Sequence, residues 1–327
     1  MSFDNLSNNK IKKLNLALLA LFTFSSLVIV FIVPVIGIIG LAILPIPATL
    51  LVISGRIRDA IISAVLGVVL LFFFNYILAI IIIIMIIAVS FSYKFYIEQN
   101  KSIKFIIIGI LIIFLAAGLL YIMIVSAVNR VNFIRETLNG YNNYIDNISS
   151  DSILKDYAGL MMIDDTQFEI VLSQTQYILR FIPYLLPGIF MVCLASIGII
   201  NYQFSHTILK KYNTKIKPLP LFKNWDIPWY WCWGIILGLI LILIPSFNSS
   251  MDKLIDVVGF NLLVLFGMLY FVLGVSVLWG LFEKFKIRII WRAVILVVIS
   301  LFMGLVIILP IVGLFDTWIN FRRLKRR

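Results

Sequence analysis

Long, uninterrupted apolar runs constrain this chain more than any other feature of its sequence. Several of them reach the roughly 20 residues that a helix needs to cross about 30 Å of hydrocarbon. Hydrophobic residues make up 62% of the chain and charged residues only 13%, too few to cover the surface of a soluble protein of 327 residues. Because lipid offers the backbone no hydrogen-bond partners, we expect an all-α fold, a polytopic bundle of transmembrane helices.

Nine apolar segments are predicted along the chain, which corresponds to about eight to nine spans. The stretch from Asp59 to Tyr93 is too long for one span and is divided at Asn75–Tyr76, where polar residues interrupt it. The segments are 14–33, 36–54, 59–74, 77–93, 104–127, 177–203, 230–247, 257–282 and 289–314.

Basic residues are concentrated in alternate loops. They precede the first segment and follow the second, fourth, sixth and eighth. Since short cytoplasmic loops carry the excess of Lys and Arg, we expect a cytoplasmic N-terminus and a multi-pass protein of the bacterial plasma membrane. The same bias accounts for the net charge of +12, so no nucleic-acid partner is predicted.

A large loop, 128–176, is then expected outside. It holds seven acidic residues and three basic ones. Apolar residues recur in it at helical spacing, so the loop is predicted to form two amphipathic helices that extend the fifth and sixth spans. These helices could pack on each other, on the membrane or on a protein partner, or could cover the outer mouth of a cavity.

The C-terminal stretch LPIVGLFDTWINFRRLKRR, residues 309–327, breaks this regular pattern. Nine complete crossings would place its five basic residues outside, against the charge rule. Two alternatives remain open. Segment 289–321 could bend at Gly304 or Pro310 and return, or the tail could lie outside and bind anionic lipid headgroups.

Four polar residues at or near the predicted spans form the candidate substrate-binding site: Asn75, Arg180, Asn261 and Asp316. Such groups are costly in a membrane and tend to mark pathways or pairings. Asn75 could instead be a turn residue, and Arg180 could extend to the headgroups. On a continuing helix, Asp316 would share a face with Asn320 and Arg323, which predicts an Asp316–Arg323 pair or a ligand contact.

Catalytic and metal-binding patterns are not found. His206 is the single histidine and has no acid within a helical turn, while Cys193 and Cys232 lack CxxC spacing. The aromatic cluster after Asn224, WDIPWYWCWG, is typical of a membrane-interface belt. We therefore predict no enzyme activity, no cofactor and no metal site.

Three stretches carry a resemblance to a known family: NWDIPWYW, MLYFVLGVSVLWGLFEKF and LPIVGLFDTWINFRRL. Together they resemble the bacterial YybS-like integral membrane proteins, a family of unknown function, most specifically over Gly313–Arg323. Residues 44–73 are similar to the second and third spans of S components of energy-coupling-factor transporters. The resemblance implies an S-component-like six-helix region, residues 1–210, followed by C-terminal transmembrane helices with a basic tail, residues 211–327.

Two functions are expected on these grounds. The first is binding or transport of a small solute, in a pocket that opens toward loop 128–176. The second is a non-catalytic membrane scaffold for envelope or spore assembly, in which that loop and the basic ends contact proteins. Membrane lipids are expected partners in both cases, because the apolar faces need them.

Overall fold

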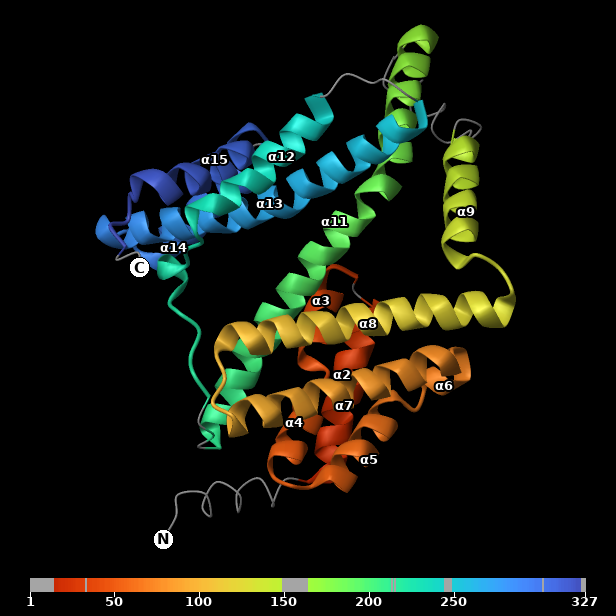
Figure 1. Cartoon of the computed structure of the whole chain (residues 1–327), viewed down its shortest axis with the longest axis vertical. Helices are drawn as coiled ribbons and strands as arrows, with labels where there is room; N and C mark the ends of the chain where they lie inside the picture. Colours follow the sequence, from red (N-terminus) through yellow and green to blue (C-terminus); the bar gives the residue numbers. More distant parts are fainter. Residues whose placement is uncertain are drawn as a thin grey trace. The chain divides into compact units, whose positions relative to one another are not determined.

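The computed structural model describes residues 15–32, 34–148, 164–212, 214, 216–243, 249–301 and 303–324, and all regular structure within them is helical (Figure 1). The chain forms two compact units. Unit 1 contains Met1–Tyr144 and Cys193–Leu219, and unit 2 contains Ile145–Val192 and Pro220–Arg327. The predicted division at residue 210 rests on a family resemblance and not on contacts within the structure, and it stays a prediction.

Unit 1 is built around α7, which contacts α4, α5 and α8. Figure 1 shows α7 and α8 side by side. The helices of this unit are α2 (Leu16–Ile32), α3 (Pro34–Ile43), α4 (Ile46–Ile53), α5 (Ile57–Val68), α6 (Leu71–Phe74), α7 (Tyr76–Glu98), α8 (Ile103–Asn129), most of α9 (Phe133–Ile148) and the second part of α11 (Asp165–Lys211).

Polar side chains in the core of unit 1 are paired with one another across helices. The Tyr93 hydroxyl donates to Asn201 Oδ1 over 2.7 Å, and Asn201 Nδ2 donates to the Ala42 carbonyl over 2.6 Å. All three residues are fully buried. Because a buried polar group without a partner is costly, this network specifies how α7 and α11 meet the end of α3.

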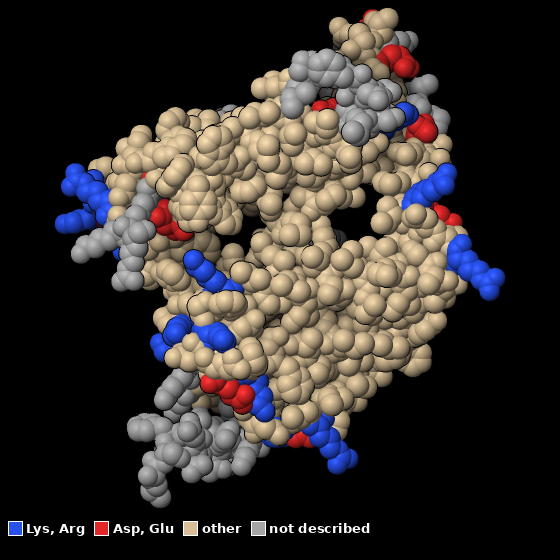
Figure 2. Space-filling model, in the orientation of Figure 1, with Lys and Arg blue, Asp and Glu red and all other residues tan. Residues whose placement is uncertain are grey.

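Unit 2 is built around α13 (Ser249–Lys284), which lies beside α12 (Cys232–Leu243) and α15 (Met303–Ile319) in Figure 1 and contacts both. The unit also contains α14 (Ile289–Leu301), the first part of α11 and two short 3₁₀ turns, Phe222–Asn224 and Trp229–Trp231. Figure 2 shows lysine and arginine at the end of this unit where the C-terminus lies, while the broad visible face over α12 and α13 shows few charges.

Glycines allow α13 and α15 to approach backbone to backbone. A Cβ atom on Gly274 would lie 1.9 Å from the Leu309 carbonyl oxygen, and one on Gly313 would lie 2.2 Å from that of Tyr270. Without a hydrophobic effect inside lipid, such close van der Waals packing is what holds helices together. Gly274 and Gly313 therefore set the spacing of the two helices.

The predicted spans are helical where the structure describes them, but three of them, 36–54, 59–74 and 289–314, are each divided between two helices. Four helical stretches are long and apolar enough to cross a membrane: Tyr76–Glu98, Ile103–Asn129, Thr166–Lys211 and Leu254–Lys284. Shorter apolar helices are Leu16–Phe31, Gly37–Ile53, Trp229–Leu243, Ile289–Ile299 and Ile307–Ile319. The division at Asn75 is confirmed, because its side chain accepts from the Leu78 amide and caps the start of α7.

The two predicted extensions of the large loop are found where the structure describes it. α9 is separated from α8 by Arg130, which adopts a left-handed conformation with φ of 55°. α11 runs without interruption from Asp165 into the sixth span. The rest of the predicted second amphipathic helix, residues 152–163, lies outside the described residues.

The last apolar segment bends and returns. α14 ends at Leu301 and α15 begins at Met303, so both of the predicted bend sites, Gly304 and Pro310, lie inside α15. Arg292, in the first turn of α14, approaches Glu283 at the end of α13, and Arg322, after α15, contacts Ser276 on α13. Both ends of the segment therefore lie at the same end of α13, beside the basic turn 284–288.

This return predicts that the C-terminal tail lies on the same side as the turn 284–288, which the charge rule places in the cytoplasm. A cysteine added after Arg327, in a chain with Cys193 and Cys232 replaced by alanine, should resist an impermeant thiol reagent in intact cells. As a control, Asn142→Cys on α9 should be labelled. Labelling of both sites to the same extent would contradict the return.

Gly274→Ala should destabilise the protein by about 1–3 kcal/mol or more, because its methyl group would collide with the backbone of α15. Gly267→Ala is the matched control on the same helix, since no atom lies within 4 Å of its Cβ position. Thermal unfolding in detergent measures both. Equal melting temperatures would show that the α13–α15 contact is not tight.

Candidate functional site

A buried ion pair joins the end of α15 to the rest of unit 2. Arg322 Nη2 lies 2.8 Å from Asp316 Oδ2, and the two side chains are 4% and 1% exposed. Arg322 Nη1 donates to the Lys223 carbonyl over 2.7 Å and to the Ser276 hydroxyl oxygen over 2.8 Å. One guanidinium thus connects α15, α13 and the segment before α12, as its fixed fork of donors allows.

The chain after α15 takes a shape that brings Arg322 back to Asp316. Asn320 has a φ of 52°, in the left-handed region where asparagine often ends helices. Its side chain accepts from the Leu324 amide and donates to the Leu324 carbonyl. α15 therefore ends at Ile319, and the predicted continuous helix through Arg323 is wrong, as is the predicted Asp316–Arg323 pair.

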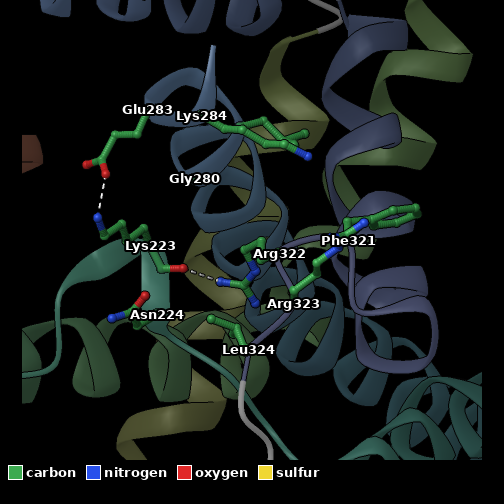
Figure 3. A pocket seen from close by; sticks show the side chains of 10 residues that line it. Lys223, Asn224, Gly280, Glu283, Lys284, Phe321, Arg322, Arg323 and Leu324 are labelled. Atoms are coloured by element: carbon green, nitrogen blue, oxygen red, sulfur yellow. Dashed lines mark hydrogen bonds and ion pairs between the residues drawn. The ribbon is translucent and has the colours of Figure 1, made fainter. Parts of the chain in front are cut away.

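A cleft of about 480 Å³ lies against this ion pair (Figure 3). It is formed by the end of α13, the segment before α12 and the residues after α15. Its lining residues are Lys223, Asn224, Gly280, Leu281, Glu283, Lys284, Phe321, Arg322, Arg323 and Leu324. Gly280 lies beside the Arg322 side chain, and a Cβ there would be in ordinary contact with Arg322 Cδ, at 3.4 Å.

The lining of the cleft is basic. Lys223 Nζ lies 2.5 Å from Glu283 Oε2, and Arg322 is neutralised by Asp316. In the part of the chain that the structure describes, no carboxylate forms an ion pair with Lys284 or Arg323. In the view of Figure 3 these two side chains extend toward Phe321, on the opposite side from the Lys223–Glu283 pair. The cleft can therefore accept negative charge.

Asn261 has a structural role at the bend-prone part of α11. Its Nδ2 donates to the Tyr184 carbonyl over 2.7 Å, and its Oδ1 accepts from the Gly188 amide over 2.5 Å. These two backbone groups would bond to each other in a regular helix, and Pro183 and Pro187 lie beside them. The Asn261 amide satisfies both, which is the requirement for irregular backbone at membrane depth.

The other two predicted site residues also have partners within the chain. Asn75 caps α7 and donates to the Tyr121 hydroxyl over 3.0 Å. Arg180 forms an ion pair with Asp146 between α11 and α9, and both side chains are more than half exposed. Their predicted contact with a ligand stays a prediction.

The four predicted site residues are divided between the two units. Asn75 belongs to unit 1, and the other three belong to unit 2. Within unit 2, Asn261 lies 15 residues before Ser276 on α13, about 22 Å along the helix at 1.5 Å per residue, and Asp316 is near Ser276 through Arg322. Of Asn261 and Asp316, only Asp316 thus lies beside the cleft.

Sequence reasoning missed Lys223, Glu283 and Arg322. Glu283 is an acid within a basic turn, and Ser276 is a polar residue within an apolar span; both were signals for this end of α13. No group of three or more His, Cys, Asp and Glu side chains in the described residues is arranged to hold a metal ion.

Comparison with known proteins gives a family. A model described as "Predicted membrane protein (DUF2232)" matches residues 20–317. The chain belongs to the DUF2232 family. No curated protein and no solved structure matches it. The family match includes most of the stretches on which the resemblance to YybS-like proteins rests, but it gives no link to transporter S components.

In this DUF2232 protein, the stretch G-L-F-D-x-W-x-x-F-R-R combines several structural roles. Gly313 permits the contact with α13, Asp316 is buried, and Arg322 pairs with it. The same eleven residues therefore position α15 and form one wall of the cleft.

Asp316→Asn should destabilise the protein by about 3–5 kcal/mol, because it leaves Arg322 buried without its counter-charge. The double variant Asp316→Leu/Arg322→Met should be more stable than the single one, since it removes both charges. Asp226→Asn is the control, because Asp226 is more exposed and lies 4.0 Å from Arg322. Melting temperatures in detergent that rank the double variant below Asp316→Asn would refute this account.

Proposed function

We propose that this DUF2232 protein is a non-catalytic membrane protein that binds a small anionic solute, or the small anionic headgroup of a larger ligand, in the cleft at the end of α13. The observation that carries the proposal is the pair of cations, Lys284 and Arg323, that line the cleft without an ion-pair partner among the described residues. Opposite charge on a ligand would balance them.

The permanent part of the site is held rigidly. Arg322 is fixed by hydrogen bonds to Asp316, Ser276 and the Lys223 carbonyl. Lys284 and Arg323 are exposed, so they can adjust to a ligand. Because Arg322 is already fixed, the ordering cost of binding is limited to the Lys284 and Arg323 side chains.

The charge rule favours the cytoplasmic face for this cleft, in contrast to the outward-opening pocket expected from Asn75, Arg180 and Asn261, with Asp316 as a further contact. Binding at that face fits a transporter that takes up or releases an anion there, with energy supplied by a partner or a gradient. It equally fits a protein that senses the anion. Transport and sensing are therefore two forms of the same proposal, which share anion binding in the cleft.

A scaffold for envelope or spore assembly is the alternative, and one observation favours it. α9 and the first part of α11, predicted to lie outside, expose large apolar side chains. Ile134 and Tyr144 on α9 are 53% and 68% exposed, and Val171 on α11 is 58% exposed. Such residues are suited to contacts with another protein or with lipid.

Soluble anions should stabilise the purified full-length protein. We expect millimolar glycerol 3-phosphate, inorganic phosphate or sulfate, at constant ionic strength, to raise the melting temperature of the wild type by a few degrees. The cleft variant, Lys284→Gln/Arg323→Gln, should lose most of this shift because it removes both unbalanced cations.

The matched control variant is Lys286→Gln/Arg288→Gln. Both residues belong to the basic turn 284–288 that also contains Lys284, but neither lines the cleft. Each pair contains one residue with positive φ, Arg323 at 52° and Lys286 at 55°, so backbone strain is comparable. Equal shifts in both variants would refute a site in the cleft. If deletion of residues 136–170 also removed co-purifying proteins, the scaffold would become the better proposal.

A further inference from the structure

We infer that the ligand of the cleft is an anionic phospholipid, held by its phosphate between Lys284 and Arg323. This inference rests on the proposed function and names the class of ligand. Three features of the described residues carry it: the kind of cations, the apolar residues among them, and the level of the cleft relative to an aromatic belt.

The cations suit a phosphate group. Arg323 offers a planar fork of donors, which matches the oxygen atoms of a phosphate, and Lys284 adds a compact point charge. Both belong to the cleft lining, one from the end of α13 and one from the chain after α15. A phosphate between them would therefore bridge the two segments that Arg322 already holds together.

Apolar residues line the same cleft, which a soluble anion would not require. Leu281, Phe321 and Leu324 are part of the lining, and Phe321 is 41% exposed. In Figure 3, Phe321 lies on the side toward which Lys284 and Arg323 extend. An amphiphile would place its charged group on the cations and its glycerol and first methylene groups on these residues.

An apolar path leads away from the cleft along α15. Phe315, Trp318 and Ile319 precede Phe321 in the sequence and are 45%, 51% and 59% exposed. Because α15 is one of the shorter apolar helices of the described residues, we expect these exposed side chains to face lipid tails. An acyl chain could follow this surface while its headgroup stays in the cleft.

The expected depth of the cleft relative to the membrane surface also fits a lipid headgroup. Lys223 lies two residues before Trp225, in the segment that leads to Trp229, Trp231 and Trp233 at the start of α12. These last three tryptophans are 57%, 40% and 59% exposed. Exposed tryptophans at the start of a span mark the headgroup level, and basic pockets on the cytoplasmic side there bind anionic lipids.

The test compares lipid and headgroup on the full-length protein in neutral detergent. We expect phosphatidylglycerol to bind at least about tenfold more tightly than glycerol 3-phosphate, as followed by melting temperature and by native mass spectrometry. Phosphatidylcholine, which has no net charge, should bind at least tenfold more weakly than phosphatidylglycerol. The cleft variant should lose at least tenfold in apparent affinity for phosphatidylglycerol, and the control variant less than twofold.

The outcomes separate this inference from the proposed function. If glycerol 3-phosphate binds in a way that depends on Lys284 and Arg323, but phosphatidylglycerol binds no more tightly, the inference fails and the proposed function stands. If neither binds, both fail. If phosphatidylglycerol affects the cleft variant and the control variant equally, its effect is that of general charge, and the lipid site is refuted.

Discussion

The ion pair between Asp316 and Arg322 is the interaction on which the C-terminal unit depends. Two charges with almost no exposure would be costly unless every partner were in place. Here the guanidinium also binds Ser276 on α13 and the backbone at Lys223, so a single side chain holds three separate segments. The direction of the last helix, the turn after it and the shape of the cleft all follow from this arrangement.

A second constraint acts where helices are irregular within the membrane. α11 contains Pro183 and Pro187, and proline removes a backbone donor and crowds the preceding turn. Lipid cannot satisfy the groups that are released, so another helix must do so. Asn261 does this from α13 by binding both Tyr184 and Gly188. The polar residue at membrane depth is thus explained by the backbone of its neighbour.

Much of the fold could be predicted from the sequence, because span length and apolar composition are local properties. The helix boundary at Asn75 was found for the same reason, since a capping residue acts on its own turn. The candidate site was less accessible. Asp316 was recognised as unusual, but its partner was not, because a helix was assumed to continue past Asn320. Lys223 and Ser276 join the cluster through contacts between residues 46 to 99 positions apart, which helical periodicity does not encode.

The glycine contact between α13 and α15 also fixes how the two helices are aligned along their length. Val312 and Leu314 flank Gly313, and Leu273 and Val275 flank Gly274. A slip of α15 by one position would drive a branched side chain into the opposing carbonyl groups, so the two helices have one permitted alignment along their length. The two glycines thereby determine the distance between Asp316 and Ser276. That distance in turn determines whether the Arg322 guanidinium can contact both residues.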